Sequence, residues 1–222
     1  MLHESTIAWT VGDPPRLYSC VRDARPIHYR LDARDCLTAV NEAWVAEAHA
    51  APEPTLAAPS VLGRNLWQLI HDFPVRHLFT ALFQRLRAGE VPEAAYIFRC
   101  DTPAQRRLHR LRITPAPEAA LDFESAILAV QPRPPVSLLD SATPRSAEFL
   151  RICGWCKRVP LAGDRWVEIE EALAHLDSLD RVPVPALSHG ICPRCERTLL
   201  KLLDQPAGPE TGIARFGEWH SA

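Results

Sequence analysis

The chain lacks several features that would assign it to a common class of protein. No apolar run approaches the roughly 18–20 residues that a membrane-spanning helix needs, and Met1 to Asp13 lack the basic and then apolar pattern of a secretion signal. The charge balance is near zero, with 25 Lys and Arg against 27 Asp and Glu, so the positive charge typical of nucleic-acid-binding proteins is absent. We therefore expect a cytoplasmic protein whose partners are neither membranes nor nucleic acids.

Familiar catalytic motifs are missing as well. The sequence contains no Gly-x-Gly-x-x-Gly or Walker-type loop and no Gly-x-Ser-x-Gly elbow. These are the local patterns that bind dinucleotides or phosphates or present a nucleophilic serine. Their absence favours a protein that is not an enzyme.

Cysteine is sparse, yet four of the seven cysteines form two matched pairs, Cys153-Gly-Trp-Cys156 and Cys192-Pro-Arg-Cys195. The Cys-x-x-Cys spacing lets both thiolates of a pair bind one ion from a single tight turn, and two such turns complete a tetrahedral shell. We expect Gly154 to supply conformational freedom in the first turn. Cys192 is expected at the N-cap of a helix that begins with Pro193.

Zinc is the first choice of ion, because four cysteines with no open position are typical of a structural zinc site. Two alternatives stay open: iron or an iron–sulfur cluster, and a metal-free dithiol switch. His189 is expected to hydrogen-bond to a sulfur as an outer-sphere residue rather than to bind the ion. The acidic cluster Glu168, Glu170 and Glu171 is most simply a solvated helix face.

Proline content suggests how the chain divides. Proline fixes the backbone and removes donors, and the segment around Pro134, Pro135 and Pro144 is therefore predicted to be a stiff, extended linker. The predicted units are a larger domain at 20–133, the linker at 134–147, a four-cysteine metal-binding module at 148–204, and a flexible tail at 205–222.

Periodicity in the first unit predicts an α+β fold. Alternating or short apolar runs predict five strands, and Val75 to Leu86 has the 3.6-residue apolar stripe of an amphipathic helix. Asn41 is expected to cap a short helix. The order of these strands and helices along the chain predicts a five-stranded antiparallel sheet with helices on one face. The strands are expected at Pro26–Asp32, Cys36–Val40, Ala94–Cys100, Leu108–Thr114 and Phe123–Val130.

This order, together with Ile27-His-Tyr-Arg-Leu-Asp32, Leu37-Thr-Ala-Val-Asn-Glu-Ala-Trp44 and Val61-Leu-Gly-Arg-Asn-Leu-Trp67, resembles the PAS domain family of sensory modules. The resemblance implies a pocket between sheet and helices and a homodimer through this domain. It names no ligand: the cysteine motif of flavin-binding light sensors is absent, and His77 is expected to face solvent and His71 to lie between helices. Core packing is favoured over a ligand-binding role for the aromatic residues. The candidate pocket residues are Tyr29, Trp44, Trp67 and His109.

The cysteine-rich stretch resembles a small zinc-ribbon-like module that follows sensory domains in bacterial signalling proteins. Its pattern is Ile152-Cys-Gly-Trp-Cys-Lys157, then Trp166 before an acidic helix, then Ser188-His-Gly-Ile-Cys-Pro-Arg-Cys195, with extra residues Ser178 to Ala186 in this chain. The resemblance implies four metal ligands and a role in signal transduction with an unknown protein partner. We expect a non-enzymatic sensory or scaffold protein; the alternative is a redox or gas sensor that uses iron or reversible thiol oxidation.

Overall fold

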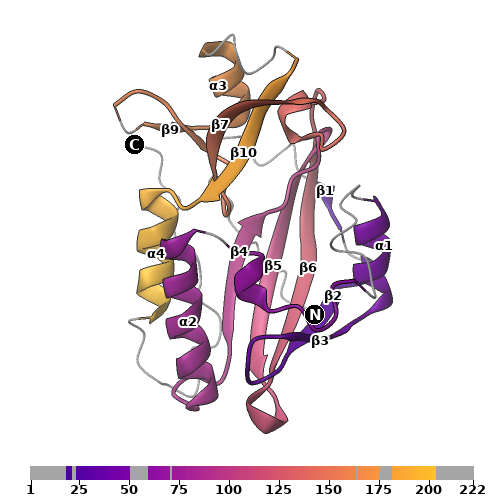
Figure 1. Ribbon diagram of the computed structural model, residues 1–222, viewed down its shortest axis with the longest axis vertical. Helices are drawn as coiled ribbons and strands as arrows, with labels where there is room; N and C mark the ends of the chain where they lie inside the picture. Colours follow the sequence, from indigo (N-terminus) through magenta and orange to yellow (C-terminus); the bar gives the residue numbers. More distant parts are fainter. Residues whose placement is uncertain are drawn as a thin grey trace, which may run out of the picture.

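An antiparallel sheet forms the centre of the structure, a computed structural model (Figure 1). Its five main strands have the spatial order β3-β2-β6-β5-β4, and the short strand β1 pairs with β6 in addition. The structure describes residues 19–21, 24–50, 60–70, 72–163, 165–175 and 182–203. The predicted tail at 205–222, His71 and residues 178–181 of the extra segment lie outside these ranges.

All five predicted strands are present, and the α+β fold with a five-stranded antiparallel sheet is confirmed. The last two strands extend further than the sequence pattern predicted, because each continues along its neighbour for 11 or 12 residues. The strands are β1 Ser19–Cys20, β2 Ile27–Leu31, β3 Leu37–Val40, β4 Ala94–Arg99, β5 Gln105–Pro115 and β6 Leu121–Pro132.

Alternation along the strands separates the two faces of the sheet. On β5, Leu111 and Ile113 are buried, whereas Arg110 and Arg112 between and beside them are exposed. Ile113 pairs in register with Phe123 of β6, and Tyr29 of β2 pairs with Phe123 from the other side. One face therefore packs into the core and the other carries charged side chains, as expected for an antiparallel sheet.

Helix α2, Phe73–Arg87, covers the apolar face as its sequence predicted. Its buried residues are Val75, Leu78, Leu82, Phe83 and Leu86, which recur at helical spacing, while His77 is exposed. Asp72 caps the helix by accepting a hydrogen bond from the amide of Val75 (3.1 Å), and Pro74 lies in the first turn, where its missing N–H does no harm.

The shorter helix α1, Glu42–Ala50, follows β3 directly. The side chain of Asn41 accepts a hydrogen bond from the amide of Trp44 (3.0 Å), so the predicted cap is confirmed. A 3₁₀ turn at Leu66–Gln68 precedes α2 and is capped by Asn65 in the same manner. No helix among the described residues has the length and apolar character that crossing a membrane requires.

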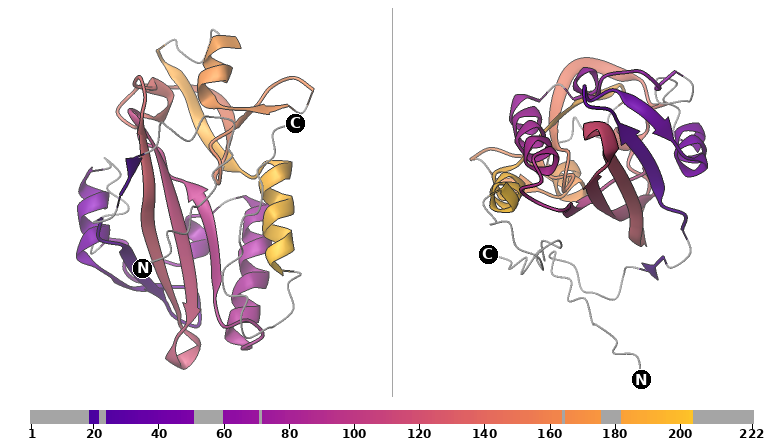
Figure 2. Two further views of the ribbon diagram at one scale, coloured as in Figure 1. Left: turned by 180° about the vertical axis from the view of Figure 1, so that it is seen from behind. Right: turned by 90° about the horizontal axis from the view of Figure 1, so that it is seen from below.

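The strands of the cysteine-bearing unit and its first helix lie at one end of the sheet, and its last helix lies beside α2 (Figures 1 and 2). Its central feature is a parallel pair of strands, β7 and β10, accompanied by the short antiparallel pair β8 and β9. Its elements are β7 Arg145–Cys153, β8 Val159–Pro160, β9 Trp166–Val167, α3 Ile169–His175, β10 Val184–Gly190 and α4 Pro193–Leu203.

The proline-rich segment between the two units is packed rather than freely extended. It contains a 3₁₀ turn at Ser137–Leu139 and the start of β7. Val136 and Leu138 are buried in a small apolar cluster with Ile152, Val184 and other residues of the cysteine unit. The larger apolar cluster, on the face of the sheet that α2 covers, also contains residues of both units. Leu82 of α2 and Leu199 of α4 are among them.

Candidate metal centre

The first cysteine turn begins where β7 ends. Cys153 is the last residue of the strand, and its amide donates to the carbonyl of Arg158 (2.8 Å) while its own carbonyl accepts from the amide of Lys157 (3.0 Å). These two bonds close a tight loop that brings Cys156 back beside Cys153. The expected special role of Gly154 is wrong: the left-handed backbone in this turn is at Lys157 (φ 61°), and Gly154 has an ordinary φ.

The second turn delivers its cysteines from the end of β10 and the start of α4. Gly190 accepts a hydrogen bond from the amide of Gly154 (2.8 Å), which joins the two turns. A side chain at Gly190 would collide with Arg151, since a Cβ there would lie 2.3 Å from its Nε. The amide of Cys195 donates to the sulfur of Cys192 (3.4 Å), so Cys192 lies at the predicted cap position.

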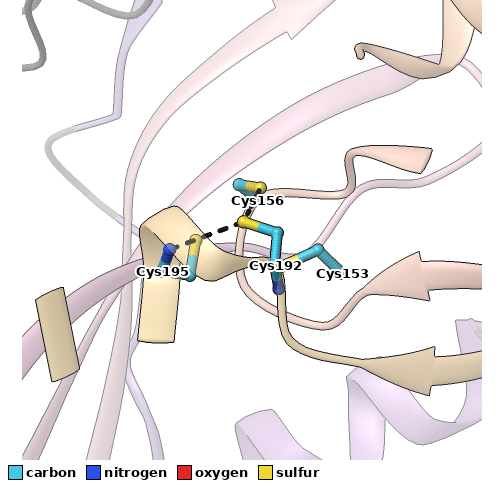
Figure 3. Close-up of side chains that lie close together, drawn as sticks. All are labelled: Cys153, Cys156, Cys192 and Cys195. Carbon is cyan, nitrogen blue, oxygen red and sulfur yellow. Dashed lines mark hydrogen bonds between the residues drawn. The ribbon is translucent and has the colours of Figure 1, made fainter. Parts of the chain in front are cut away.

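The four sulfur atoms converge on one point (Figure 3). All four lie within 4.8 Å of one another, and those of Cys156 and Cys192 are 3.7 Å apart. A tetrahedral zinc ion with bonds of about 2.3 Å would hold its sulfurs about 3.8 Å apart, so this spacing suits such an ion. All four cysteines are free of disulfide bonds and almost fully buried, the most exposed being Cys156 at 6 %.

Backbone amides and neighbouring thiols stabilise negative charge on the cluster. The amide of Cys192 donates to the sulfur of Cys153 (3.4 Å). Hydrogen bonds from the thiols of Cys156, Cys192 and Cys195 lower the pKa of Cys153, and the hydrogen bond to Cys153 raises the pKa of Cys195. One thiolate is thus favoured before any ion binds, and a bound cation would displace the remaining protons.

His189 lies outside the sulfur cluster. It is on β10 opposite Ile152, its side chain is exposed, and its imidazole makes no hydrogen bond within the part of the chain that the structure describes. The group of residues that could hold an ion together consists of the four cysteines alone among the described residues. A role for His189 as an outer-sphere partner of a sulfur stays a prediction.

Three of the four candidate pocket residues, Tyr29, Trp44 and Trp67, are half-buried and pack against the core of the sheet domain. Tyr29 packs edge-on against Trp44 (ring centroids 5.2 Å apart), and Trp67 packs on Phe83 (5.7 Å) while its Nε1 donates to Asp35 (2.8 Å). A cleft between α2, α4 and the first cysteine turn contains none of the four. Its lining residues are Leu78, Phe79, Leu82, Tyr96, Trp155, Leu199 and Leu203.

His109 is the most enclosed of the four, at 2 % exposure. Its Nδ1 is 3.2 Å from the hydroxyl of Ser125, its ring is 5.3 Å from that of Phe98, and its Nε2 has no hydrogen-bond partner among the described residues. Burial lowers the pKa of this imidazole to about 4, so it is neutral at physiological pH. The ligand-pocket role of the four residues stays a prediction.

Sequence reasoning missed a buried network of ion pairs beside the metal centre. Glu168 pairs with Arg99 and Arg158, and Glu170 pairs with Arg106 and Arg133. The expectation that these glutamates form a solvated helix face is therefore wrong for Glu168 and Glu170, although Glu171 is exposed. No local pattern predicts the network, because three of its four arginines lie more than 30 residues away, on β4, β5 and the segment after β6, and only Arg158 is closer in sequence.

The ion pairs of this network stabilise the charged forms of Glu170 and Arg99. Burial raises the pKa of Glu170, but the hydrogen bond from Arg106 and the neighbouring cations outweigh it, and the pKa falls to about 2. Burial disfavours the charged form of Arg99 as well, and the charges of Glu168 and Asp101 more than compensate, so that its pKa is raised. These groups are fully charged at neutral pH and fix the cysteine unit against the sheet.

Comparison with known proteins yields little. No family model matches the chain, and no curated protein matches it. Among solved structures, a sensory box sensor histidine kinase from Vibrio cholerae matches with a TM-score of 0.30 and 9% sequence identity, covering 47% of this chain and 82% of that one.

Proposed function

We propose that this chain is a non-enzymatic signal-transduction protein, sensory or scaffold in role, whose four-cysteine centre holds a structural zinc ion. The observation that carries the proposal is the closed set of four buried sulfurs within 4.8 Å of one another. When bound, zinc would supply a cross-link between two turns that are far apart in sequence. In small metallo-domains such binding contributes about 10–16 kcal/mol to folding.

The chemistry of the donor set supports zinc as a structural ion. Thiolates are soft ligands, and a four-cysteine tetrahedral shell is typical of structural zinc. A catalytic zinc keeps one position for water or substrate, usually with a histidine or carboxylate among its ligands. Glu168, a carboxylate of the ion-pair network, is already paired with Arg99 and Arg158.

The sheet domain supports the signalling part of the proposal. Its five-stranded antiparallel sheet, with α2 on the apolar face, is the architecture that the sequence resemblance to sensory modules implied. We extend the proposal to a homodimer through this domain, an unidentified protein partner, and a cytoplasmic setting in which the four thiols stay reduced.

Elemental analysis and a visible absorption spectrum of the full chain, purified without added metal, test the proposal. We expect about one zinc per chain and no visible absorption, because zinc thiolate sites are colourless. Stoichiometric iron with visible bands would replace the zinc assignment by the redox or gas-sensor alternative. A metal-free protein whose four clustered cysteines are all free thiols would refute the structural metal site itself.

A further inference from the structure

The end of strand β4 is bonded directly to the first cysteine turn. β4 is an edge strand whose sheet partner is β5, so its outward backbone groups lack a strand partner within the described part of the sheet. The amide of Arg99 donates to the carbonyl of Trp155 (2.6 Å), which lies between the first two cysteines. The turn therefore takes the place that a further strand would occupy beside β4.

The side chain of Arg99 makes a second link to the same turn. Its guanidinium donates to the carbonyl of Cys156 (3.2 Å) and also pairs with Asp101 and Glu168. Arg99 is only 6 % exposed, and a buried cation cannot exchange these acceptors for water without a large cost. One residue of the sheet thus binds two consecutive carbonyls of the metal-binding turn.

Aromatic contacts continue from the turn along the apolar face of the sheet. The indole of Trp155 lies 6.3 Å from the ring of Tyr96 on β4, and Tyr96 lies 6.1 Å from Phe98. Phe98 pairs in register with His109 of β5, with ring centroids 5.3 Å apart. The metal-binding turn and the buried His109 are therefore connected through neighbouring side chains of one hairpin.

The cysteine turn is the element whose constraints depend on the ion. With an ion bound, four metal–sulfur bonds fix both carbonyls that Arg99 contacts. Without it, the sulfurs keep their hydrogen bonds to one another and to the amides of Cys192 and Cys195, and the turn keeps its backbone hydrogen bonds but lacks the metal cross-link. Asp101 and Glu168 still hold the guanidinium in that state, so the bonds to Trp155 and Cys156 are the ones that loosen.

We propose that Arg99 couples occupancy of the metal centre to the order of the β4–β5 hairpin, so that loss of the ion loosens the apolar face around Phe98 and His109. The proposal rests on the metal centre proposed above. Coupling of this kind is reciprocal: a molecule or partner that binds the ordered hairpin more tightly raises the affinity for the ion by the same factor.

Hydrogen exchange of the full chain, with zinc bound and after chelation under reducing conditions, tests the coupling. We expect amides from Phe98 to His109 to exchange at least about tenfold faster without zinc, and amides of β2 and β3 to change by less than about twofold. In R99Q, which loses the guanidinium bond to Cys156 but keeps the amide bond to Trp155, the difference between the two states should become smaller than that of wild type while zinc is retained. The matched control is R112Q, an exposed arginine of the same sheet that pairs with Glu93, and it should behave as wild type.

Other results would contradict the coupling, the metal centre or the role of Arg99. Zinc that binds and leaves without changing exchange in β4 and β5 overturns the coupling and leaves the metal centre intact. A chain that binds no metal overturns both. If R99Q does not fold, R99K tests the residue instead. The ammonium group of lysine cannot reproduce the planar contacts of the guanidinium to Cys156, Asp101 and Glu168. An exchange difference in R99K as large as that of wild type would overturn the assignment to Arg99.

Discussion

The indole ring of Trp155 stacks on the phenyl ring of Phe79, with centroids 5.9 Å apart and planes inclined by 27°. Trp155 lies in the middle of the first cysteine turn, and Phe79 lies on α2, the helix that covers the sheet. The contact joins the metal-binding unit to the core of the sheet domain through apolar area, in addition to the polar bonds of Arg99. The two units therefore share part of their stability.

Truncation of Phe79 should weaken both units together. We expect Phe79→Ala to reduce the free energy of unfolding by about 2–3 kcal/mol, somewhat less than for a fully buried phenylalanine. A double-mutant cycle with Trp155→Ala should show a coupling of about 0.5–1.5 kcal/mol. Urea denaturation of the zinc-loaded chain measures both quantities. Phe73→Ala on the same helix, at a site 78 % exposed, is the control and should change stability by less than about 0.5 kcal/mol.

Loss of one carboxylate from the buried network should be costly. Glu168→Gln leaves Arg99 and Arg158 without one of their anionic partners, and we expect a loss of about 2–4 kcal/mol. The comparison is Glu171→Gln, whose pair with Arg165 is exposed and should contribute less than about 1 kcal/mol. Equal losses for the two variants, measured by urea denaturation, would contradict the burial of the network.

Removal of a single sulfur should release the ion. In Cys192→Ser, a hydroxyl replaces a soft thiolate ligand, and we expect the zinc content to fall to below about a tenth of that of wild type. Cys36→Ser is the matched control, because Cys36 lies on the sheet domain outside the cluster. Metal content of the two purified variants decides the ligand assignment, and retention of a full zinc in Cys192→Ser would refute it.

The buried His109 should make stability depend on pH. Its pKa is about 4 in the folded protein and about 6.5 in the unfolded chain, which therefore binds a proton more readily. The neutral imidazole therefore makes its full contribution to the free energy of unfolding above about pH 6.5, and this contribution is lost as the pH falls toward 4. Between about pH 7.5 and pH 5.5 we expect wild type to lose about 1 kcal/mol more than His109→Gln.

Urea denaturation in excess zinc at both pH values checks this prediction. His77→Gln is the control, since His77 is exposed on α2, and it should keep the pH dependence of wild type. A wild-type slope equal to that of His109→Gln would show that His109 does not carry the effect.

Much of the fold could be predicted from local patterns. The stripe on α2, the alternation on β5 and the cap at Asn41 each depend on neighbours within a few residues, and each was confirmed. The approach of the four cysteines could also be expected, because Cys-x-x-Cys spacing brings two thiols together in a single turn.

Other features depend on contacts that no local pattern contains. Arg99 is an ordinary residue at a strand end, and only the docking of the cysteine turn makes it a buried cation. Glu168 and Glu170 are half-buried and ion-paired because arginines from other elements lie beside them. The left-handed backbone at Lys157 likewise follows from the bonds that close the turn, which stabilise a conformation that lysine rarely adopts.

The parallel pairing of β7 and β10 determines when the ion can be captured. Cys153 lies opposite Gly190 in register, and the two strands run in the same direction, so β8, β9 and α3 must cross from the end of one strand to the start of the other. Cys153 and Cys192 are 39 residues apart in sequence, and closing such a loop is slow compared with forming a local turn. An unfolded chain presents two separate dithiols, each a weak chelator. We therefore expect full coordination to be a late event of folding, with tight metal uptake by the unfolded chain limited by assembly of this crossover.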